Sequence, residues 1–307
     1  MEDNITDIDY DSVQALEEFN GFHNNSGVGQ LYLCATPIGN LEDITFRVLR
    51  ILKEVDIIAA EDTRNSIKLL NHFEINTPMT SYHEYNKYDK AKVLVEKMLK
   101  GMSVAVITDA GTPGISDPGE ELVRQALASG INVSSVPGAA ACITALTMSG
   151  QATRRFAFEA FLPADKNERK DILKELEDET RTMIIYEAPH RLLKTLRELS
   201  EVLGGSRAVT ICKELTKRYE NSMVTTLAEA CSYYENNQPR GEYVLVIAGK
   251  DRNELKEEAQ AHWLTMSEQE HVDMYIAQGL DKKEAMKAAA RDRGVSKRDI
   301  YNKLLGN

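Results

Sequence analysis

The chain has 307 residues, of which 42% are hydrophobic and 28% are charged, and its formal net charge is −11. This is the composition of a globular protein with room for two domains, and its acidity argues against nucleic-acid binding over the whole surface. No apolar run reaches the length of a membrane span, and the first residues lack the basic start and apolar core of a signal peptide. The four cysteines form no CxxC pair, which is typical of reduced thiols. We therefore expect a cytoplasmic protein.

The first segment, residues 1–28, is acidic and contains few large apolar residues. It holds Asp and Glu but no Lys or Arg, and it ends in NNSGVG, so we expect a flexible leader. At the other end, residues 281–307 hold more Lys and Arg than Asp and Glu. The negative charge is therefore unevenly spread, and the carboxyl-terminal end is locally basic.

From residue 29, short apolar runs alternate with helical patterns. The strand-like runs are 30–36, 56–61, 103–109 and 131–137, and the helical patterns between them are 46–55, 66–73, 90–99 and 120–129. This alternation predicts βαβ units around a parallel sheet that is buried on both faces. A helix of small residues after residue 137 would close this half. We predict an amino-terminal α/β domain at 29–150.

The second half begins after GQATRR and contains more strand. Its expected strands are 156–163, 182–189, 208–215, 222–227 and 242–249, and its expected helices are 168–179, 191–204 and 228–237. This half contains more strand than the first, which favours a mixed sheet. We predict a second α/β domain at 151–250, so that the fold class of the chain is α/β.

The last part, 251–307, changes to charged helical patterns. Ser267, Asp281 and Ser296 are placed where helix N-caps would be, and Gly279 and Gly294 where helices would end. Three short helices of a helix-turn-helix-like domain fit this pattern. The segment alone leaves open whether they serve packing or nucleic-acid binding.

Four loops follow strands of the first half, at 36–44, 61–66, 108–119 and 136–141. Because open parallel sheets bind ligands at the carboxyl ends of their strands, these loops predict a binding site. The longest, TDAGTPGISDPG at 108–119, exceeds the usual length of about two to six residues for such connections. Its glycines would let a ligand approach the backbone, and its prolines would stiffen it.

Other ligand signatures are missing from the sequence. It has no GxxxxGK[ST], no GxGxxG after the first strand and no GxSxG, and its histidines show no metal-ligand spacing. Polar clusters follow four of the apolar strands, at 61–64, 82–86, 187–191 and 213–218. We expect them to line a cleft between the two halves, and we expect no metal site.

Several long motifs follow one another along the chain: ATPIGNLEDITFR, AAEDTRNS, LLNHF, SYHEYN, TDAGTPGISDPG, VPGAAA, YEAPHR and KELTKRYE. With them, residues 30–250 resemble the ribosomal RNA small subunit methyltransferase I family of the tetrapyrrole methylase superfamily. The resemblance implies two class III methyltransferase domains with a cleft between them, a small helical domain and a homodimer. It also implies 2′-O-methylation, by S-adenosylmethionine, of a cytidine in the decoding region of 16S rRNA in the small ribosomal subunit.

The resemblance also implies site residues, carried over where the motifs match. Donor-binding positions are Pro37, Asp109, Ala110, Gly111, Ile115, Ala140, Ala141, Tyr186 and Leu215. Asp109 and Ala110 stand where tetrapyrrole enzymes typically have glycines. S-adenosylhomocysteine would be the product.

For the transfer itself, a ribose hydroxyl is a weak nucleophile and needs a base to orient or deprotonate it. Candidates for catalysis are Glu187, Lys213, Glu61, Arg64 and His83, with Asp62 and Glu214 as further possible bases. We favour Glu187 and Lys213. If Glu187 is the base, replacing it by Gln should collapse the rate.

RNA binding by so acidic a chain must depend on local basic patches. Candidates are Arg154, Arg155, Lys217 and Arg218, together with Lys166, Arg169, Lys170 and the basic end. Two alternatives remain from the sequence. A precorrin-type tetrapyrrole methyltransferase shares the fold, although SYHEYN, YEAPHR and the helical end fit it poorly. A non-catalytic ribosome-assembly factor that binds the donor is more distant.

Overall fold

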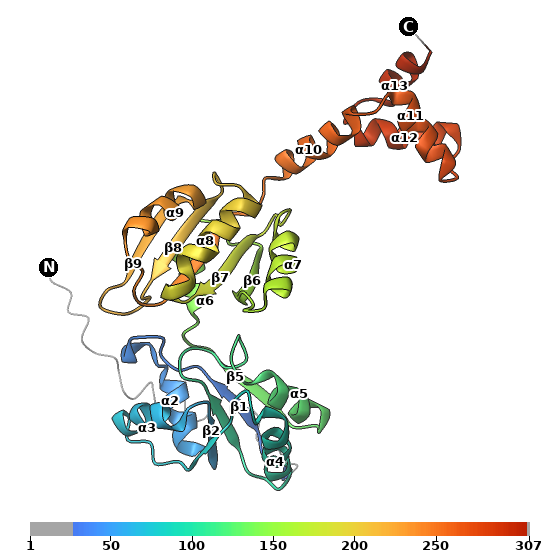
Figure 1. Ribbon diagram of the computed structural model, residues 1–307. Coiled ribbons are helices and arrows are strands. Elements are labelled where there is room, and N and C mark those ends of the chain that lie inside the picture. The colour runs from blue at the N-terminus through green and yellow to red at the C-terminus, as the bar shows by residue number, and fades with distance from the viewer. Residues whose placement is uncertain (1–26, 306–307) are drawn as a thin grey trace, which may run out of the picture. The chain divides into compact units, whose positions relative to one another are not determined.

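The computed structural model describes residues 27–305 (Figure 1). The expected acidic leader therefore lies outside the described residues, except for its last two positions. The chain divides into two compact units between Ala141 and Cys142, ahead of the boundary expected at 150. Each unit contains one five-stranded sheet, and a group of helices follows the second sheet.

The first unit is built on a parallel sheet with the strand order β3-β2-β4-β1-β5. Its strands are β1 (Leu31–Cys34), β2 (Ile57–Ala60), β3 (Met79–Ser81), β4 (Val104–Ile107) and β5 (Val133–Val136). The parallel sheet predicted from the apolar runs is confirmed. The sequence did not reveal β3, because it has only three half-buried residues at the edge of the sheet.

Helices cover both faces of this sheet. They are α2 (Phe46–Glu54), α3 (Thr63–His72), α4 (Lys87–Leu99) and α5 (Glu120–Ala128), with a short 3-10 helix, η1 (Leu41–Asp43). In β4, Ala105 and Ile107 pack with residues of α2 and α3, whereas Val104 and Val106 pack with residues of α4 and α5. The strands are thus buried on both sides, which explains their continuous apolar runs.

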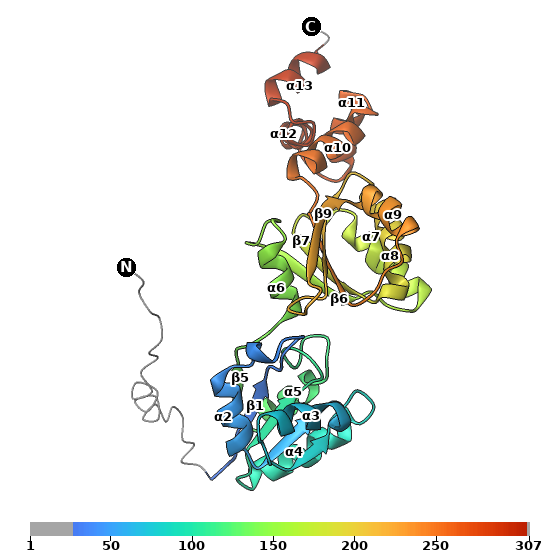
Figure 2. The same ribbon diagram turned by 90° about the vertical axis from the view of Figure 1, so that its left-hand side faces the viewer.

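The second unit has the mixed sheet that the sequence predicted, in the order β6-β7-β10-β8-β9. Figure 2 views this sheet nearly edge-on, with helices on both of its sides. Its strands are β6 (Phe156–Phe161), β7 (Thr182–Glu187), β8 (Ala208–Lys213), β9 (Asn221–Thr226) and β10 (Tyr243–Ile247). Only β6 and β7 are parallel neighbours, and the other pairs are antiparallel. The helices α7 (Lys166–Leu176), α8 (Pro189–Leu203) and α9 (Leu227–Asn236) share one apolar core with one face of the sheet.

The helix α6 (Ala141–Met148) packs on the other face of the second sheet. Thr210 Oγ1 donates to the carbonyl of Ser149 over 2.8 Å, and the Tyr186 hydroxyl accepts from Cys142 N over 2.9 Å. The sequence pattern predicts this helix at the end of the first half, whereas the structure places it in the second unit from Cys142 onward. Its small residues reveal no partner in the sequence, because such a helix can approach either sheet closely.

The carboxyl-terminal helices are α10 (Arg252–Leu264), α11 (Glu268–Ala277), α12 (Lys282–Asp292) and α13 (Lys297–Leu304). The three predicted N-caps are confirmed, because Ser267, Asp281 and Ser296 each accept a hydrogen bond from a backbone N–H in the first helical turn. Gly279 and Gly294 follow α11 and α12 with φ values of 95° and 65°. These left-handed conformations favour glycine and end the helices.

A buried polar cluster joins α10, α11 and α12. The fully buried His271 ring stacks on Trp263 with 4.2 Å between ring centroids, and Arg293 Nε donates to His271 Nδ1 over 3.1 Å. Arg293 also pairs with Glu268 over 3.4 Å. Burial and the Arg293 cation lower the pKa of His271. The folded module therefore favours the neutral imidazole, whose Nδ1 accepts the hydrogen bond from Arg293.

The structure also shows whether any helix could span a membrane and whether the cysteines are paired. Of the helices in residues 27–305, none is long and apolar enough to cross a membrane. All four cysteines are free thiols, and Cys34, Cys142 and Cys212 are buried, as expected from the apolar segments that contain them.

Candidate functional site

The loops after β1, β2, β4 and β5 emerge at one edge of the first sheet, because all these strands run parallel. This is the arrangement that the sequence predicted. We call the segments that meet there the L1 loop (35–40), the L4 loop (108–119) and the L5 loop (137–140). The strand β2 is followed by Glu61 and Asp62, which lead directly into α3.

A two-bond bridge joins the L1 and L4 loops. Thr36 N donates to Gly111 O over 2.9 Å, and Gly111 N donates to Thr36 O over 3.0 Å. The Thr36 hydroxyl also donates to the carbonyl of Thr108 over 3.1 Å. Gly111 has a φ of 88°, a left-handed conformation that side chains disfavour. The bridge fixes the direction in which Pro37 and the following residues leave the sheet.

The L4 loop is also packed against the L5 loop. Thr112 Oγ1 donates to Ala139 O over 2.9 Å. A Cβ atom on Gly138 would lie 2.6 Å from that of Ala35, and one on Gly119 would lie 2.8 Å from Gly114 N. At these two positions the missing side chain allows two chain segments to approach each other, whereas for Gly119 the sequence suggested an approaching ligand.

The outer rim of the L4 loop is the part that is open to a ligand. Asp109, Ala110 and Ile115 are exposed, whereas Gly111 and Pro113 are buried. Ile115 is 38% exposed, which presents an apolar side chain at the sheet edge. Of the donor-binding residues predicted in this loop, three therefore lie on the open rim and Gly111 supports it from within.

Three carboxyl groups gather at this edge. Glu61 Oε2 accepts from Asp109 N over 3.3 Å, and Asp109 Oδ2 accepts from Asn65 Nδ2 over 3.1 Å. Burial, followed by the charges of Glu61 and Asp109, raises the pKa of Asp117 to about 7. Burial also raises the pKa of Glu61. The edge is thus electrostatically suited to a positively charged ligand.

Asp117 gives a test of this cluster. Between its ordinary pKa of 3.8 and the folded-state value of about 7, the carboxyl ionises only in the unfolded chain, so stability falls as the pH rises through this range. Asp117→Asn removes this penalty. Because the group is only partly buried, we expect a gain of about 1 kcal/mol, or roughly 2–4 °C in Tm, at pH 8.

At pH 4 the Asn variant and the parent chain should have nearly the same Tm, because the pH is then only just above the ordinary pKa of 3.8, where the penalty begins. Thermal unfolding at both pH values measures the difference. An equal shift at both would show that Asn acts through packing and not through the charge.

Arg64 and His83 lie near the same edge. Asp62 caps α3 by accepting from Arg64 N over 2.9 Å and also binds the Arg64 guanidinium over 2.7 Å, which lowers the pKa of Asp62 to about 2. Arg64 nevertheless remains 88% exposed. His83 N donates to Asn86 Oδ1 over 2.9 Å, and its buried Nδ1 has no hydrogen-bond partner among the described residues.

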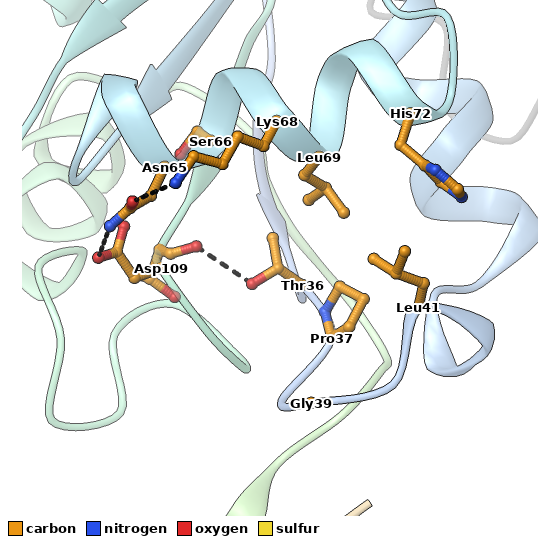
Figure 3. A pocket seen from close by; sticks show the side chains of 11 residues that line it. Thr36, Pro37, Gly39, Leu41, Asn65, Ser66, Lys68, Leu69, His72 and Asp109 are labelled. Carbon is orange, nitrogen blue, oxygen red and sulfur yellow. Dashed lines mark hydrogen bonds between the residues drawn. The ribbon is translucent and has the colours of Figure 1, made fainter. Parts of the chain in front are cut away.

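A cavity of about 360 Å³ opens between α3 and the L1 loop (Figure 3). The α3 face from Asn65 to His72 forms one wall, and Pro37, Gly39 and Leu41 form another. Pro37 and Asp109 are the only predicted site residues that line it. Lys68 and His72 were not among the predicted site residues, although the interval of four residues from Arg64 to Lys68 and from Lys68 to His72 is visible in the sequence.

In the second unit, Tyr186 and Glu187 end β7. The Tyr186 ring packs edge-on against Phe158, with 4.9 Å between centroids. Glu187 is buried: its oxygens accept from Ala188 N over 2.9 Å and from the Thr195 hydroxyl, and it pairs with Arg191 over 3.3 Å. Within this unit, Glu187 thus organises the start of α8 and does not face solvent.

The turn after β8 contains the remaining predicted residues. Lys213 is half-buried at the end of the strand, Leu215 is buried and Arg218 is exposed. Glu214 and Thr216 adopt left-handed φ values of 52° and 63°.

Lys217 is held by two carboxylates, at 3.0 Å from Glu214 and 2.8 Å from Glu242. Its ammonium is therefore less available to RNA than the guanidinium of Arg218.

The other residues that were predicted to contact RNA differ in their exposure. Arg154 and Arg155 are exposed before β6. Arg169 is buried, pairs with Glu198 over 2.7 Å and donates to Thr195 over 2.7 Å, so the expectation that it contacts RNA is wrong. No group of three or more His, Cys, Asp or Glu within residues 27–305 is arranged to hold a metal ion.

Comparison with known proteins first identifies the fold class of the chain. The profile of the family described as Tetrapyrrole (Corrin/Porphyrin) Methylases matches residues 30–231. Uroporphyrin-III C-methyl transferase from Thermus thermophilus, solved in complex with S-adenyl homocysteine, has a TM-score of 0.50 and 20% identity. The alignment covers 71% of this chain and 97% of that one. The fold is thus that of the tetrapyrrole methylases.

Two relatives then identify the particular family within this class. Ribosomal RNA small subunit methyltransferase I of Halalkalibacterium halodurans is 50% identical over 274 residues, covering 89% of this chain and 94% of that protein. The protein of the same name from Bacillus subtilis is 46% identical, covering 92% and 96% respectively. The chain belongs to the ribosomal RNA small subunit methyltransferase I family, which confirms the resemblance found in the sequence.

Proposed function

We propose that the chain transfers a methyl group from S-adenosylmethionine to the ribose 2′-oxygen of a cytidine in the decoding region of 16S rRNA, within the small ribosomal subunit in the cytoplasm. The names of the relatives support the kind of substrate. The observation that carries the proposal is the L4 loop, which is bridged to Thr36 and Ala139 while its rim stays open. A stiff loop with an exposed rim suits a ligand held in one orientation.

The residues at this edge fit the donor. S-adenosylmethionine carries positive charge on sulfur and on its amino group, and the carboxyl groups of Glu61, Asp109 and Asp117 lie where they can attract it. Ile115 and Pro37 provide apolar surface for its uncharged parts. The complex of the Thermus thermophilus enzyme supports a donor of this class for the fold. We extend the donor site to Ala110, Ala140, Ala141, Tyr186 and Leu215, as the motifs imply.

In the reaction, bound S-adenosylmethionine supplies a methyl group that is displaced in line from a sulfonium. The chain has to hold the hydroxyl in that line, exclude water and accept its proton. We assign the proton to Glu61, because its carboxyl is partly open and burial raises its pKa toward the working pH. Arg64, His83 and Lys213 would orient the RNA, and Glu187 would position the start of α8.

A methyl-transfer assay tests this function. The chain is incubated with radiolabelled donor and one acceptor at a time. The three acceptors are small ribosomal subunits, free rRNA and a corrinoid precursor. We expect label in small subunits, at one cytidine whose phosphodiester bond resists alkali because its 2′-oxygen is methylated. Label in the corrinoid would instead support a tetrapyrrole methyltransferase. Tight donor binding without any transfer would support a non-catalytic assembly factor.

For the oligomeric state we propose a homodimer. Sedimentation tests it, and a particle with the mass of one chain would contradict it.

For RNA binding we propose that phosphates are bound by basic residues of both the second sheet domain and the helical module. These are Arg154, Arg155 and Arg218, together with the exposed Lys282, Lys287 and Arg298. Lys217 would contribute once released from Glu214 and Glu242. The affinity for small subunits should then fall with salt.

A further inference from the structure

The exposed face of α3 carries three basic side chains at intervals of four residues: Arg64, Lys68 and His72. Residues four apart on a helix lie on the same face, about 5–6 Å from each other. Lys68 and His72 form no ion pair with any described residue, and the ammonium of Lys68 reaches only the neutral Oδ1 of Asn65, at 3.5 Å. We call these three residues the α3 basic face. The charge of Lys68 is open to an anionic partner, and Arg64 remains 88% exposed although it pairs with Asp62.

The α3 basic face borders the cavity of about 360 Å³. Figure 3 shows Leu69 and His72 pointing from α3 toward Pro37 and Leu41. Cavities of this size, about 300–1,000 Å³, hold a single small ligand or one unit of a larger one. An apolar lining beside cations suits a flat ring that is attached to phosphate.

Ser66 adds an independent observation. It lines the cavity and is only 5% exposed, and its hydroxyl has no hydrogen-bond partner among the described residues. A buried hydroxyl without a partner is unfavourable, and a polar ligand edge would relieve this. The carboxamide of Asn65, which also lines the cavity, offers a second polar group.

The cavity is separate from most of the donor site. It includes Pro37 and Asp109 but none of the other predicted donor residues of the first unit, which are Ala110, Gly111, Ile115, Ala140 and Ala141. A ligand here would therefore lie beside the donor rim without occupying it. The binding sites for a methyl donor and its acceptor are expected to adjoin in this way without overlapping.

We propose that this cavity binds one nucleotide of the RNA substrate, with the α3 basic face holding the adjoining phosphates. The inference rests on the proposed function. Lys68 and Arg64 contact phosphate oxygens, as basic side chains do in most nucleic-acid complexes. Leu41 and Leu69 contact the face of the base, and Ser66 with Asn65 hydrogen-bonds its edge, as is usual for an unstacked base in single-stranded RNA.

The test uses the full chain with the double replacement Lys68→Ala and His72→Ala. Removing two basic groups from an RNA-binding face should raise KM for small subunits about 10-fold or more, with a smaller change in kcat. The slope of log affinity against log salt should become shallower by about 0.7–0.9 for each phosphate that the chain no longer neutralises. The donor Kd, measured by calorimetry, should stay within about twofold.

Two controls sharpen this experiment. Lys53→Ala removes an exposed lysine in the last turn of α2 that forms no ion pair with a described residue. It should leave KM and the salt slope unchanged. Lys68→Arg, made in the His72→Ala background, keeps the cation and should restore most of the affinity. Equal melting temperatures would exclude an effect through folding.

The outcomes separate the two proposals. If the unmodified chain does not methylate small subunits, the proposed function fails. If it does, and the double variant has the unmodified KM and salt slope, the RNA site on α3 is overturned. A weaker donor Kd in the double variant, parallel to the rise in KM, would also overturn it, because the cavity would then belong to the donor.

Discussion

Replacing Glu187 by alanine is expected to lower the free energy of unfolding of the second unit by about 3 kcal/mol, since a broken buried ion pair leaves its partner uncompensated. The partner is Arg191, whose side chain is 29% exposed and lies 3.3 Å from the carboxylate. The change also removes the acceptor for Ala188 N and for the Thr195 hydroxyl. Urea unfolding measures the loss.

Glu235→Ala is the matched control for this variant. Its ion pair with Arg197 joins two side chains that are about half exposed, at 55% and 49%. Exposed pairs contribute less than about 1 kcal/mol. A similar loss in both variants would show that the burial of Glu187 does not set its contribution.

Glu187→Gln separates this structural part from catalysis. The amide retains the shape of the side chain and an oxygen that can accept from Ala188 N, so we expect turnover within about tenfold of the parent chain. A loss of about a thousandfold or more, with stability and donor Kd unchanged, would instead identify Glu187 as the base that the sequence favoured.

The second large effect is expected for Gly111→Val. The residue has a φ of 88°, and its Cβ would lie 3.3 Å from Ile38 Cγ2. A β-branched side chain in this conformation is strained by roughly 1–3 kcal/mol and would distort the bridge to Thr36. If the L4 loop binds the donor, its affinity should fall about 10- to 100-fold by calorimetry.

Gly130→Val provides the control for backbone strain alone. Gly130 also has a positive φ, of 73°, but a Cβ there meets nothing within 4 Å. It follows α5, away from the carboxyl edge of the sheet. This variant should lose stability without weakening donor binding. Unchanged donor affinity in Gly111→Val would remove the L4 loop from the donor site.

Much of the fold could be predicted because its strands carry strong local signals. The strands β1, β2 and β4 are apolar throughout, and the caps Ser267, Asp281 and Ser296 mark helix starts by their own chemistry. The assignment of α6 failed for the opposite reason. Its partner is decided by contacts such as that between Thr210 and Ser149, which are distant in the sequence.

The candidate site was predicted in position but not in detail. The L4 loop was found by its length, yet Gly119 and Gly138 turn out to serve contacts between chain segments. Arg169 was expected on the surface because arginine usually is. Its burial depends on Glu198 and Thr195, both on the next helix, and a sequence pattern does not reveal such a pairing.

Trp263 is the only tryptophan of the chain, and it stacks on His271 in the helical module. Its emission therefore reports on that module alone, while the tyrosines of the α/β units contribute at shorter wavelengths. Because the indole stacks directly on His271, loosening of the cluster would change its surroundings and would be visible in its emission without any label. The chain thus contains its own optical probe for a change in this module.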